Sequence, residues 1–298
     1  MECIQISKED RDFSLFGQVL EAIYTPEQVV FKSRESIPEQ HLHTCLVITD
    51  RGKPIARTAL YFNPDLKYKD HRAACIGSVE STHDTIALEF LISKAASLAR
   101  EHGFSYLIGP MSGSTWEAYR FSFENHFPLF FTEQLQQEYY NDLMVQTGFE
   151  TISEYFSSFT YDVAFRFPEF EALNRYFLDM GVQVSPILSE HYLDELPVLY
   201  EFLSRAFQRN FLYTPVSKEQ FINKYSEFLP LVDPDYVLKA NDAKGNLIGI
   251  YFCIPDIYNA SEKTLIIKSA ARNPGPGWRG LGHWMGQHIY DNALKKRF

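Results

Sequence analysis

Hydrophobic positions follow the three-to-four-residue spacing of helices in some stretches and form short apolar or alternating runs in others. Helical spacing predicts three helices, over 13–24, 192–207 and 218–228. Asp84 is the expected N-cap of a fourth helix that ends at Gly103, and Gly148 closes a short fifth helix over 139–146. Apolar or alternating runs predict strands, at 1–8, 73–79, 105–108, 154–165 and 265–271. The chain is therefore expected to mix helices with strands.

Two hairpins in this pattern resemble each other. Residues 46–65 and 237–256 each read as strand, turn, strand, with Asp, Gly and Lys at the turn and Pro-Asp at the end. An apolar strand and a helix follow each hairpin. Two copies of one module explain this most economically, although turn chemistry is stereotyped enough for two hairpins to agree by chance. If the module is repeated, 40–110 and 232–298 should share one strand order.

Four glycines separate the strand at 265–271 from the last helix: Gly275, Gly277, Gly280 and Gly282. They leave the backbone uncovered where the helix begins. Unpaired N–H groups and the positive end of the helix dipole then face whatever lies there. This arrangement is typical of a phosphate-binding loop. An ordinary glycine-rich turn between strand and helix is the alternative.

Three phosphate-binding motifs compete for this loop. Residues 275–280 satisfy G-x-G-x-x-G, but the dinucleotide fingerprint also needs a βαβ unit and an acidic residue about 20 positions later. A hairpin precedes the strand here, and only 18 residues follow Gly280. A P-loop needs Gly-Lys-Ser/Thr at its end, which residues 280–283 lack. The third motif is the Arg-Gly-x-Gly core of an acetyl-CoA loop, and residues 279–282 match it.

On this loop the sequence resembles the GNAT superfamily of N-acetyltransferases, whose signature is Gln/Arg-x-x-Gly-x-Gly/Ala between the fourth strand and the following helix. Residues 277–282 fit both required glycines, while Gly277 departs from the preferred Gln or Arg and Arg279 keeps a cation in the loop. The resemblance implies that backbone N–H groups from Arg279 to His283 bind the pyrophosphate of acetyl-CoA or another acyl-CoA. The cofactor-binding residues that it implies are Ala270, Ala271, Trp278, Arg279, Gly280, Leu281, Gly282 and His283.

The resemblance extends to two tandem GNAT-like modules of α/β (α+β) class, each a mixed, mainly antiparallel sheet flanked by helices. Residues 109–116, 128–133 and 139–149 resemble the first half of tandem GNAT-like proteins of bacteria. We expect an N-terminal module at 1–167 and a C-terminal module at 168–298, with a linker near Pro168. The first module has residues 77–84 in place of the glycine loop, so it is expected not to bind CoA.

The C-terminal module ends after its main helix, whereas the first module continues for about 60 residues beyond the equivalent helix. We expect either that the sequence shown is truncated there or that another segment completes the module. By family analogy, the later part of the fold carries the tyrosine that acts as general acid, so that residue is not assigned. The candidate general bases are Glu219, Glu227, Asp256 and Glu262, each of which is more often a solvated surface charge.

Composition narrows the functional classes. The formal charge of −10 argues against a general binder of nucleic-acid backbones, because such proteins carry clustered positive charge. Four dispersed cysteines without a C-x-x-C pair indicate reduced core residues of a cytoplasmic protein. The N-terminus is acidic too early for a signal peptide, and no apolar run approaches 18 residues. We expect no metal site and no membrane association.

The resemblance implies acyl transfer to a primary amine, which would attack the thioester directly. The acceptor, a small molecule or a peptide, is not identified by the sequence, and neither is the oligomeric state. Two other functions fit the same fold. One is a catalytically silent binding or scaffold protein. The other is a Fem-type aminoacyl-tRNA-dependent transferase, which would need a basic groove that the net charge disfavours.

Overall fold

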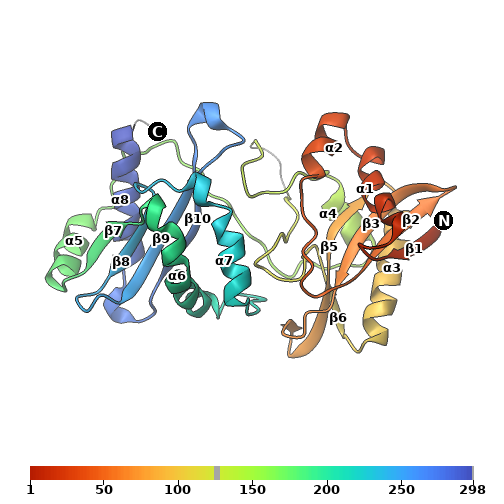
Figure 1. Ribbon diagram of the computed structural model, residues 1–298, viewed down its shortest axis with the longest axis horizontal. Helices are drawn as coiled ribbons and strands as arrows, with labels where there is room; N and C mark the ends of the chain where they lie inside the picture. The colour runs from red at the N-terminus through yellow and green to blue at the C-terminus, as the bar shows by residue number, and fades with distance from the viewer. Residues whose placement is uncertain (124–127, 297–298) are drawn as a thin grey trace. The chain divides into compact units, whose positions relative to one another are not determined.

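The computed structural model describes residues 1–123 and 128–296 (Figure 1). The chain forms two compact units. Unit 1 comprises Met1–Leu129, Glu133–Glu154 and Phe211–Thr214, and unit 2 comprises Phe130–Thr132, Tyr155–Asn210 and Pro215–Phe298. The predicted module boundary at 167/168 stays a prediction.

Unit 1 holds a six-stranded sheet with the path β1-β2-β3-β5-β4, and β6 pairs with β5. Its strands are β1 (Glu2–Ile6), β2 (Leu42–Asp50), β3 (Lys53–Tyr61), β4 (Lys67–Tyr68), β5 (His71–Ser81) and β6 (Tyr106–Ile108). Its helices are η1 (Arg11–Phe13), α1 (Ser14–Gln18), η2 (Val19–Ala22), α2 (Pro26–Lys32), α3 (Thr85–Glu101) and α4 (Tyr140–Gln146). All strand pairs are antiparallel except β5 with β6, which is parallel.

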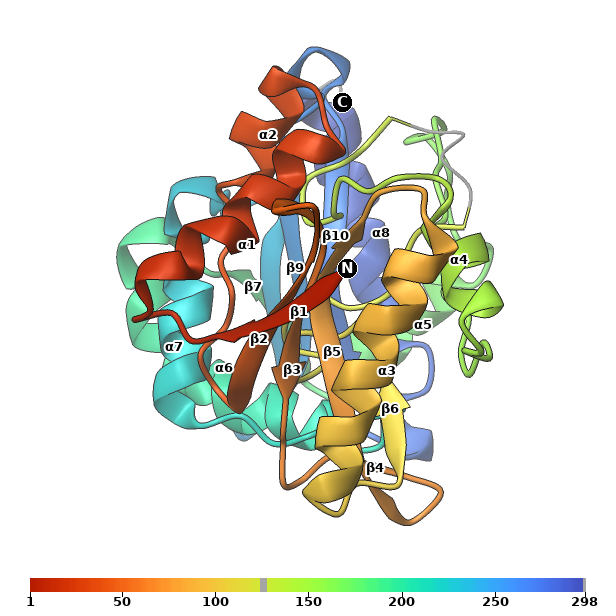
Figure 2. The same cartoon turned by 90° about the vertical axis from the view of Figure 1, so that its right-hand side faces the viewer.

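Apolar side chains cover both faces of this sheet. Helices α3 and α4 pack on the face that includes Leu46, Leu60 and Ile76. Helix α1 and η2 pack on the other face, against Val47 and Cys75. Figure 2 shows α3 running alongside β5 and β6. The fully buried strands therefore read as apolar runs rather than as a simple alternation.

Unit 2 holds a four-stranded antiparallel sheet in the order β10-β9-β8-β7. Its strands are β7 (Gln183–Pro186), β8 (Val237–Asn241), β9 (Leu247–Pro255) and β10 (Leu265–Arg272). Its helices are α5 (Phe170–Asp179), η3 (Ser189–His191), α6 (Tyr192–Phe207), α7 (Lys218–Ser226), η4 (Leu229–Leu231), η5 (Ala260–Glu262), η6 (Pro276–Trp278) and α8 (Leu281–Lys296). Helices α5 and α8 pack together on one face, with Leu238 and Ile248 of the sheet.

The two units share one order of elements: a strand, helices, a hairpin, a third antiparallel strand and a long helix. The hairpin β2–β3 with β5 and α3 corresponds to β8–β9 with β10 and α8. The third strand in each unit also has a register shift, at Arg57/Ala59 opposite β5 and at Ile267/Ser269 within β10. The strand order that the repeated hairpins predict is confirmed. The mixed α/β class with two helix-flanked sheets is confirmed as well.

Three local predictions differ from the structure. Residues 154–165 form no strand, because a strand needs a hydrogen-bonded neighbour and the described residues offer none there. The helix expected over 13–24 is divided into η1, α1 and η2. Helices α2 and α5 were not predicted. Thr25, Pro26 and Gln28 form a capping box with Pro at the first helical position, a signal that would have located α2.

Candidate functional site

The glycine loop joins β10 to α8 in unit 2. Gly275 has a φ of 110° and Gly280 a φ of 85°, a region that glycine occupies far more readily than other residues. Between them lies η6, one turn of 3-10 helix. The chain therefore adopts a positive φ twice before α8 starts at Leu281. Backbone geometry alone therefore explains why residues 275 and 280 are glycines.

The first turn of α8 presents N–H groups that the helix itself cannot pair. Trp284 N–H donates to Gly280 O at 3.0 Å and so closes the first helical turn. Among the described residues, no side chain accepts a hydrogen bond from the N–H groups of Gly282 or His283. The helix dipole adds positive potential at the same place. The N-terminus of α8 thus has no side-chain cap among the described residues, an arrangement that favours an anion.

The predicted cofactor-binding residues surround this position to different degrees. The side chains of Arg279 and His283 are exposed, as is Ala270 on β10, while Trp278 and Ala271 are half-buried. Leu281 is fully buried in the core of unit 2, so only its backbone can face a ligand. The His283 ring stacks on Phe167, with ring centroids 4.8 Å apart. Arg279 is therefore the cation of the loop that is exposed to solvent.

Tyr251 on β9 is a contact that the sequence did not reveal. Its hydroxyl donates to Gly282 O at 2.9 Å. Burial raises the pKa of Tyr251, so the phenol stays protonated and keeps donating at neutral pH. The bond ties the first turn of α8 to the sheet. No residue type or spacing in the sequence signals it, because β9 reaches α8 only through tertiary packing.

The four candidate general bases do not gather at the loop. Glu219, Glu227 and Glu262 are exposed. Asp256 is buried and accepts hydrogen bonds from Phe131 N at 2.9 Å, Tyr258 N at 3.1 Å and Asn259 Nδ2 at 2.7 Å. Its carboxylate organises the turn after β9, and this use of its oxygens leaves it poorly suited to accept a proton from a substrate.

Unit 1 has a different arrangement at the corresponding helix, α3. Asp84 is its N-cap, as predicted, and its Oδ1 accepts hydrogen bonds from Ile86 N at 2.9 Å and Ala87 N at 3.1 Å. A carboxylate therefore already occupies the place where an anion would bind. The chain after β6 also lies against β5: Met111 N donates to Ile76 O at 2.6 Å. A Cβ at Gly77 would approach Ser112 Cα to 2.6 Å, so no space remains beside that strand.

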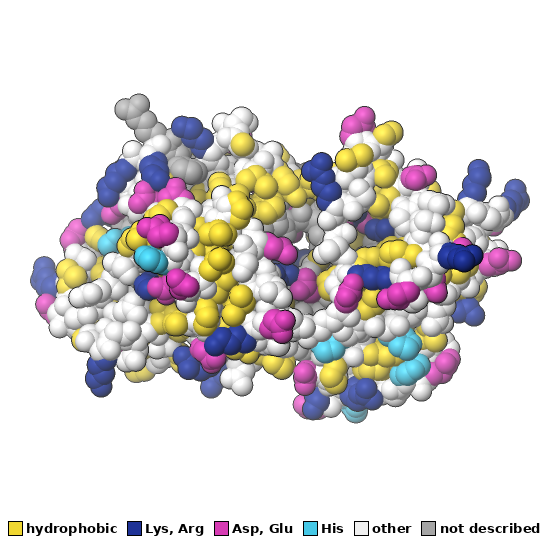
Figure 3. Space-filling model, viewed as in Figure 1, with side chains coloured by type: hydrophobic (Ala, Val, Ile, Leu, Met, Phe, Trp, Pro, Cys, Tyr) yellow, Lys and Arg dark blue, Asp and Glu magenta, His cyan; other side chains and the backbone are white. Residues whose placement is uncertain are grey.

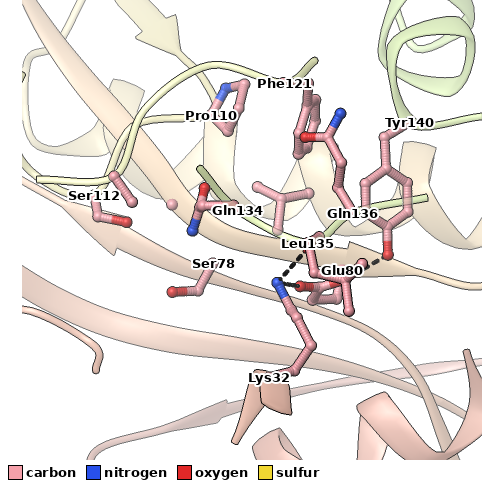
Figure 4. A pocket seen from close by; sticks show the side chains of 13 residues that line it. Lys32, Ser78, Glu80, Pro110, Ser112, Phe121, Gln134, Leu135, Gln136 and Tyr140 are labelled. Carbon is pink, nitrogen blue, oxygen red and sulfur yellow. Dashed lines mark hydrogen bonds and ion pairs between the residues drawn. The ribbon is translucent and has the colours of Figure 1, made fainter. Parts of the chain in front are cut away.

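A buried polar network lies nearby in unit 1 and was not predicted from the sequence (Figure 4). The Lys32 ammonium contacts Glu80 at 2.7 Å, Glu35 at 2.8 Å and Leu135 O at 2.9 Å. The other oxygen of Glu80 accepts hydrogen bonds from Tyr24 at 2.8 Å and Tyr140 at 2.5 Å. Burial, followed by the Glu80 charge, raises the pKa of both tyrosines.

The network borders a small hollow whose lining includes Ser78, Ser112 and Gln134. The hollow has room for about one water molecule. Lys32 and Glu80 have their charges paired, and each is almost fully buried. Removing one partner of such a pair leaves an uncompensated buried charge and destabilises the fold strongly. We therefore interpret these residues as structural, and the hollow is too small for a cofactor.

The surface and the other residue clusters add further observations. On the face drawn in Figure 3, the described Lys and Arg side chains are interspersed with Asp and Glu, without a wide basic area. Within residues 1–123 and 128–296, no helix is long and apolar enough to cross a membrane, and no group of three His, Cys, Asp or Glu side chains could hold a metal ion. Cys45, Cys75 and Cys253 are buried free thiols, and Cys3 is half-buried.

Solved N-acetyltransferases are among the structures similar to this chain. One is a GCN5-related glucosamine N-acetyltransferase region of a fungal multi-domain β-N-acetylglucosaminidase, with 14% identity over 99% of this chain and a TM-score of 0.49. This chain spans 34% of the length of that structure. Another is an aminoglycoside N-acetyltransferase in complex with CoA, with 10% identity over 53% of this chain and 98% of that one and a TM-score of 0.33.

A ribosomal-protein-alanine N-acetyltransferase from Brucella melitensis biovar Abortus 2308 is 19% identical over 36% of this chain and 78% of its own, with a TM-score of 0.27. No protein-family model and no curated protein matches the chain. The TM-scores of these structural matches are all below 0.5. At these identities they concern the fold alone.

Proposed function

We propose that unit 2 binds an acyl-CoA at the N-terminus of α8 and transfers the acyl group to a primary amine. The observation that carries this proposal is the uncapped first turn of α8 behind a glycine-rich loop. Backbone N–H groups at such a position bind phosphate oxygens without a charged side chain. Of the eight residues expected at the site, Gly282 keeps the backbone accessible, since a Cβ there would meet nothing within 4 Å, and Arg279 adds an exposed guanidinium for the pyrophosphate.

The edge of β10 supports the same function. In the described sheet of unit 2, β10 is an end strand, whereas the corresponding β5 of unit 1 pairs with β6 on its outer side. An end strand presents N–H and C=O groups that can pair with an extended partner. The pantetheine arm of CoA is extended and carries two amides, so the β10 edge can bind it next to the loop. The loop and this edge together would then orient the thioester.

A bound acyl-CoA supplies a thioester that an amine can attack, forming a C–N bond as the C–S bond breaks. The amine loses a proton, and the departing thiolate gains one. What this chain contributes is binding and orientation, which lower the entropic part of the barrier. The four carboxylates considered above lie in exposed or structural positions, so no general base is assigned among them.

Two measurements on the purified protein test this function. Isothermal titration calorimetry with acetyl-CoA should show binding by the parent protein, and loss of binding on Gly282→Asp. Release of free thiol should then be followed with a panel of primary amines. Binding together with amine-dependent thiol release supports an acyltransferase. Binding without release for any amine favours the catalytically silent alternative, and absence of CoA binding contradicts the proposal.

A further inference from the structure

We propose that helix α5 is a clamp that holds the glycine loop in its ligand-binding conformation, with Tyr176 as a positioning residue. This inference rests on the proposed function and assigns a role to a helix that the loop motif does not include.

Side chains of α5 meet the loop at successive points. Leu173 packs against Gly280: a Cβ built on Gly280 would lie 2.6 Å from Leu173 Cδ2. The hydroxyl of Tyr176 donates to Gly277 O at 3.3 Å. Helix α5 thus contacts the loop at Gly277 and Gly280, one on each side of Arg279.

The same helix also fixes the first turn of α8. Trp284 Nε1 donates to Asn174 Oδ1 at 3.0 Å, and the Trp284 ring lies 5.1 Å from that of Phe177. Trp284 is almost fully buried, so its N–H needs this partner. The loop and the helix start are consequently held by one rigid element, α5, over the stretch from Gly277 to Trp284.

A glycine loop needs such support for a physical reason. Glycine has the largest conformational freedom of all residues, so a loop with four glycines loses much entropy when it is ordered around a ligand. Contacts that order the loop before the ligand arrives remove part of that loss from the binding step. Loss of an α5 contact should therefore weaken binding of CoA although α5 need not touch the ligand.

Tyr176→Phe is the most specific test, because it removes one hydroxyl from a side chain that is 45% exposed and creates no cavity. We expect the Kd for acetyl-CoA to rise about two- to tenfold, as for loss of one hydrogen bond. In the ligand-free protein, amide hydrogen exchange should become faster at 277–283 and stay unchanged in β8 and β9. The hydrogen-exchange measurement reports how well the loop is ordered when no ligand is bound.

Tyr200→Phe is the matched control. The Tyr200 hydroxyl, on α6, also donates to a backbone carbonyl of unit 2, Val216 O at 3.1 Å. This control should leave both the Kd and the loop exchange at parental values. A Tyr176→Phe protein that binds CoA and exchanges like the parent would overturn the clamp while leaving the proposed function intact. A parent protein that binds no CoA would overturn both, and equal effects of the two variants would show that Tyr176 has only a general structural role.

Discussion

The N-termini of α3 and α8 follow equivalent strands in two units that share the order hairpin, strand, helix, yet they differ in what pairs their first N–H groups. In unit 1 the Asp84 carboxylate accepts two of them. In unit 2 no described side chain does so, and glycines leave the backbone open. An N-cap carboxylate and a bound phosphate compete for the same donors. The comparison sets a closed helix end in unit 1 against an open helix end in unit 2, where we propose that an anion binds.

The surroundings strengthen the contrast. Beside β5, the chain from Met111 to Ser112 fills the space that a ligand would need. The outer edge of β10 has no strand next to it in the described part of unit 2. A core can be kept by patterning and volume alone, whereas a phosphate site needs an uncovered backbone at a few positions. A unit with a closed helix end can therefore keep the hairpin, strand and helix that both units share.

The largest effect is expected from Gly282→Asp, which gives α8 a carboxylate in its first turn. A Cβ at Gly282 meets no atom within 4 Å, and an acidic residue in the first turn favours the helix, so folding should be retained. Repulsion of a phosphate about 5 Å away should weaken CoA binding by about 3 kcal/mol, roughly a hundredfold. Calorimetry checks this, with Gly282→Ala as the uncharged control. Equal affinity of the two variants would contradict an anion site at this helix end.

A second prediction concerns the stability of unit 2. Gly280→Ala should lower the free energy of unfolding by about 1–3 kcal/mol, because φ is 85° there and Leu173 leaves no room for a Cβ. Gly277→Ala is the control: its φ is outside the positive region and a Cβ would meet nothing within 4 Å, so its effect should be smaller. Urea denaturation followed by tryptophan fluorescence compares them. A Gly280→Ala protein as stable as the parent would show that Leu173 moves aside.

The Arg279 side chain provides a third, smaller effect. Arg279→Ala should weaken CoA binding by about 1–2 kcal/mol, the range for hydrogen bonds to charged groups. Arg279→Lys should recover only part of it, because an ammonium cannot reproduce the bidentate geometry. Titrations at increasing salt should show this contribution shrinking, since exposed charges are screened. If Arg279→Ala binds CoA like the parent at low salt, the backbone alone forms the site.

Asp84→Ala tests the N-cap of α3 in unit 1. Loss of the N-cap should lower the free energy of unfolding by about 1 kcal/mol in a thermal or urea titration. It should not create a CoA site, because Ser112 still lies against Gly77. Calorimetry on Asp84→Ala combined with Gly282→Asp isolates unit 1. CoA binding by this double variant would mean that the cap alone keeps unit 1 from binding.

Local patterns predicted much of this fold. The helix expected over 192–207 is α6 with the same bounds, and Asp84 caps α3 as its residue type and position suggest. The alternation at 154–165 predicted a strand that the structure does not contain, because strand formation depends on a neighbouring strand that the pattern does not reveal. Helix α5 has apolar residues at helical spacing, Phe170, Leu173 and Phe177, but the nearby Pro168 was interpreted as a linker.

The candidate site was predictable where it depends on backbone chemistry and unpredictable where it depends on tertiary contacts. The glycine spacing located the loop and the helix start correctly. The sequence could not show that Tyr251 and Tyr176 donate to its carbonyls, since both come from elements distant in the chain. It also suggested Asp256 as a base, although the fold uses that carboxylate to bind backbone N–H groups.

Amide hydrogen exchange of the parent protein, measured with and without acetyl-CoA, tests the central claim most directly. Both helix starts are observed in one experiment, so each serves as the reference for the other. We expect acetyl-CoA to slow exchange at 277–284 and along β10, with no change at 81–88. Protection at 81–88 without protection at 277–284 would contradict the assignment of the anion site to α8.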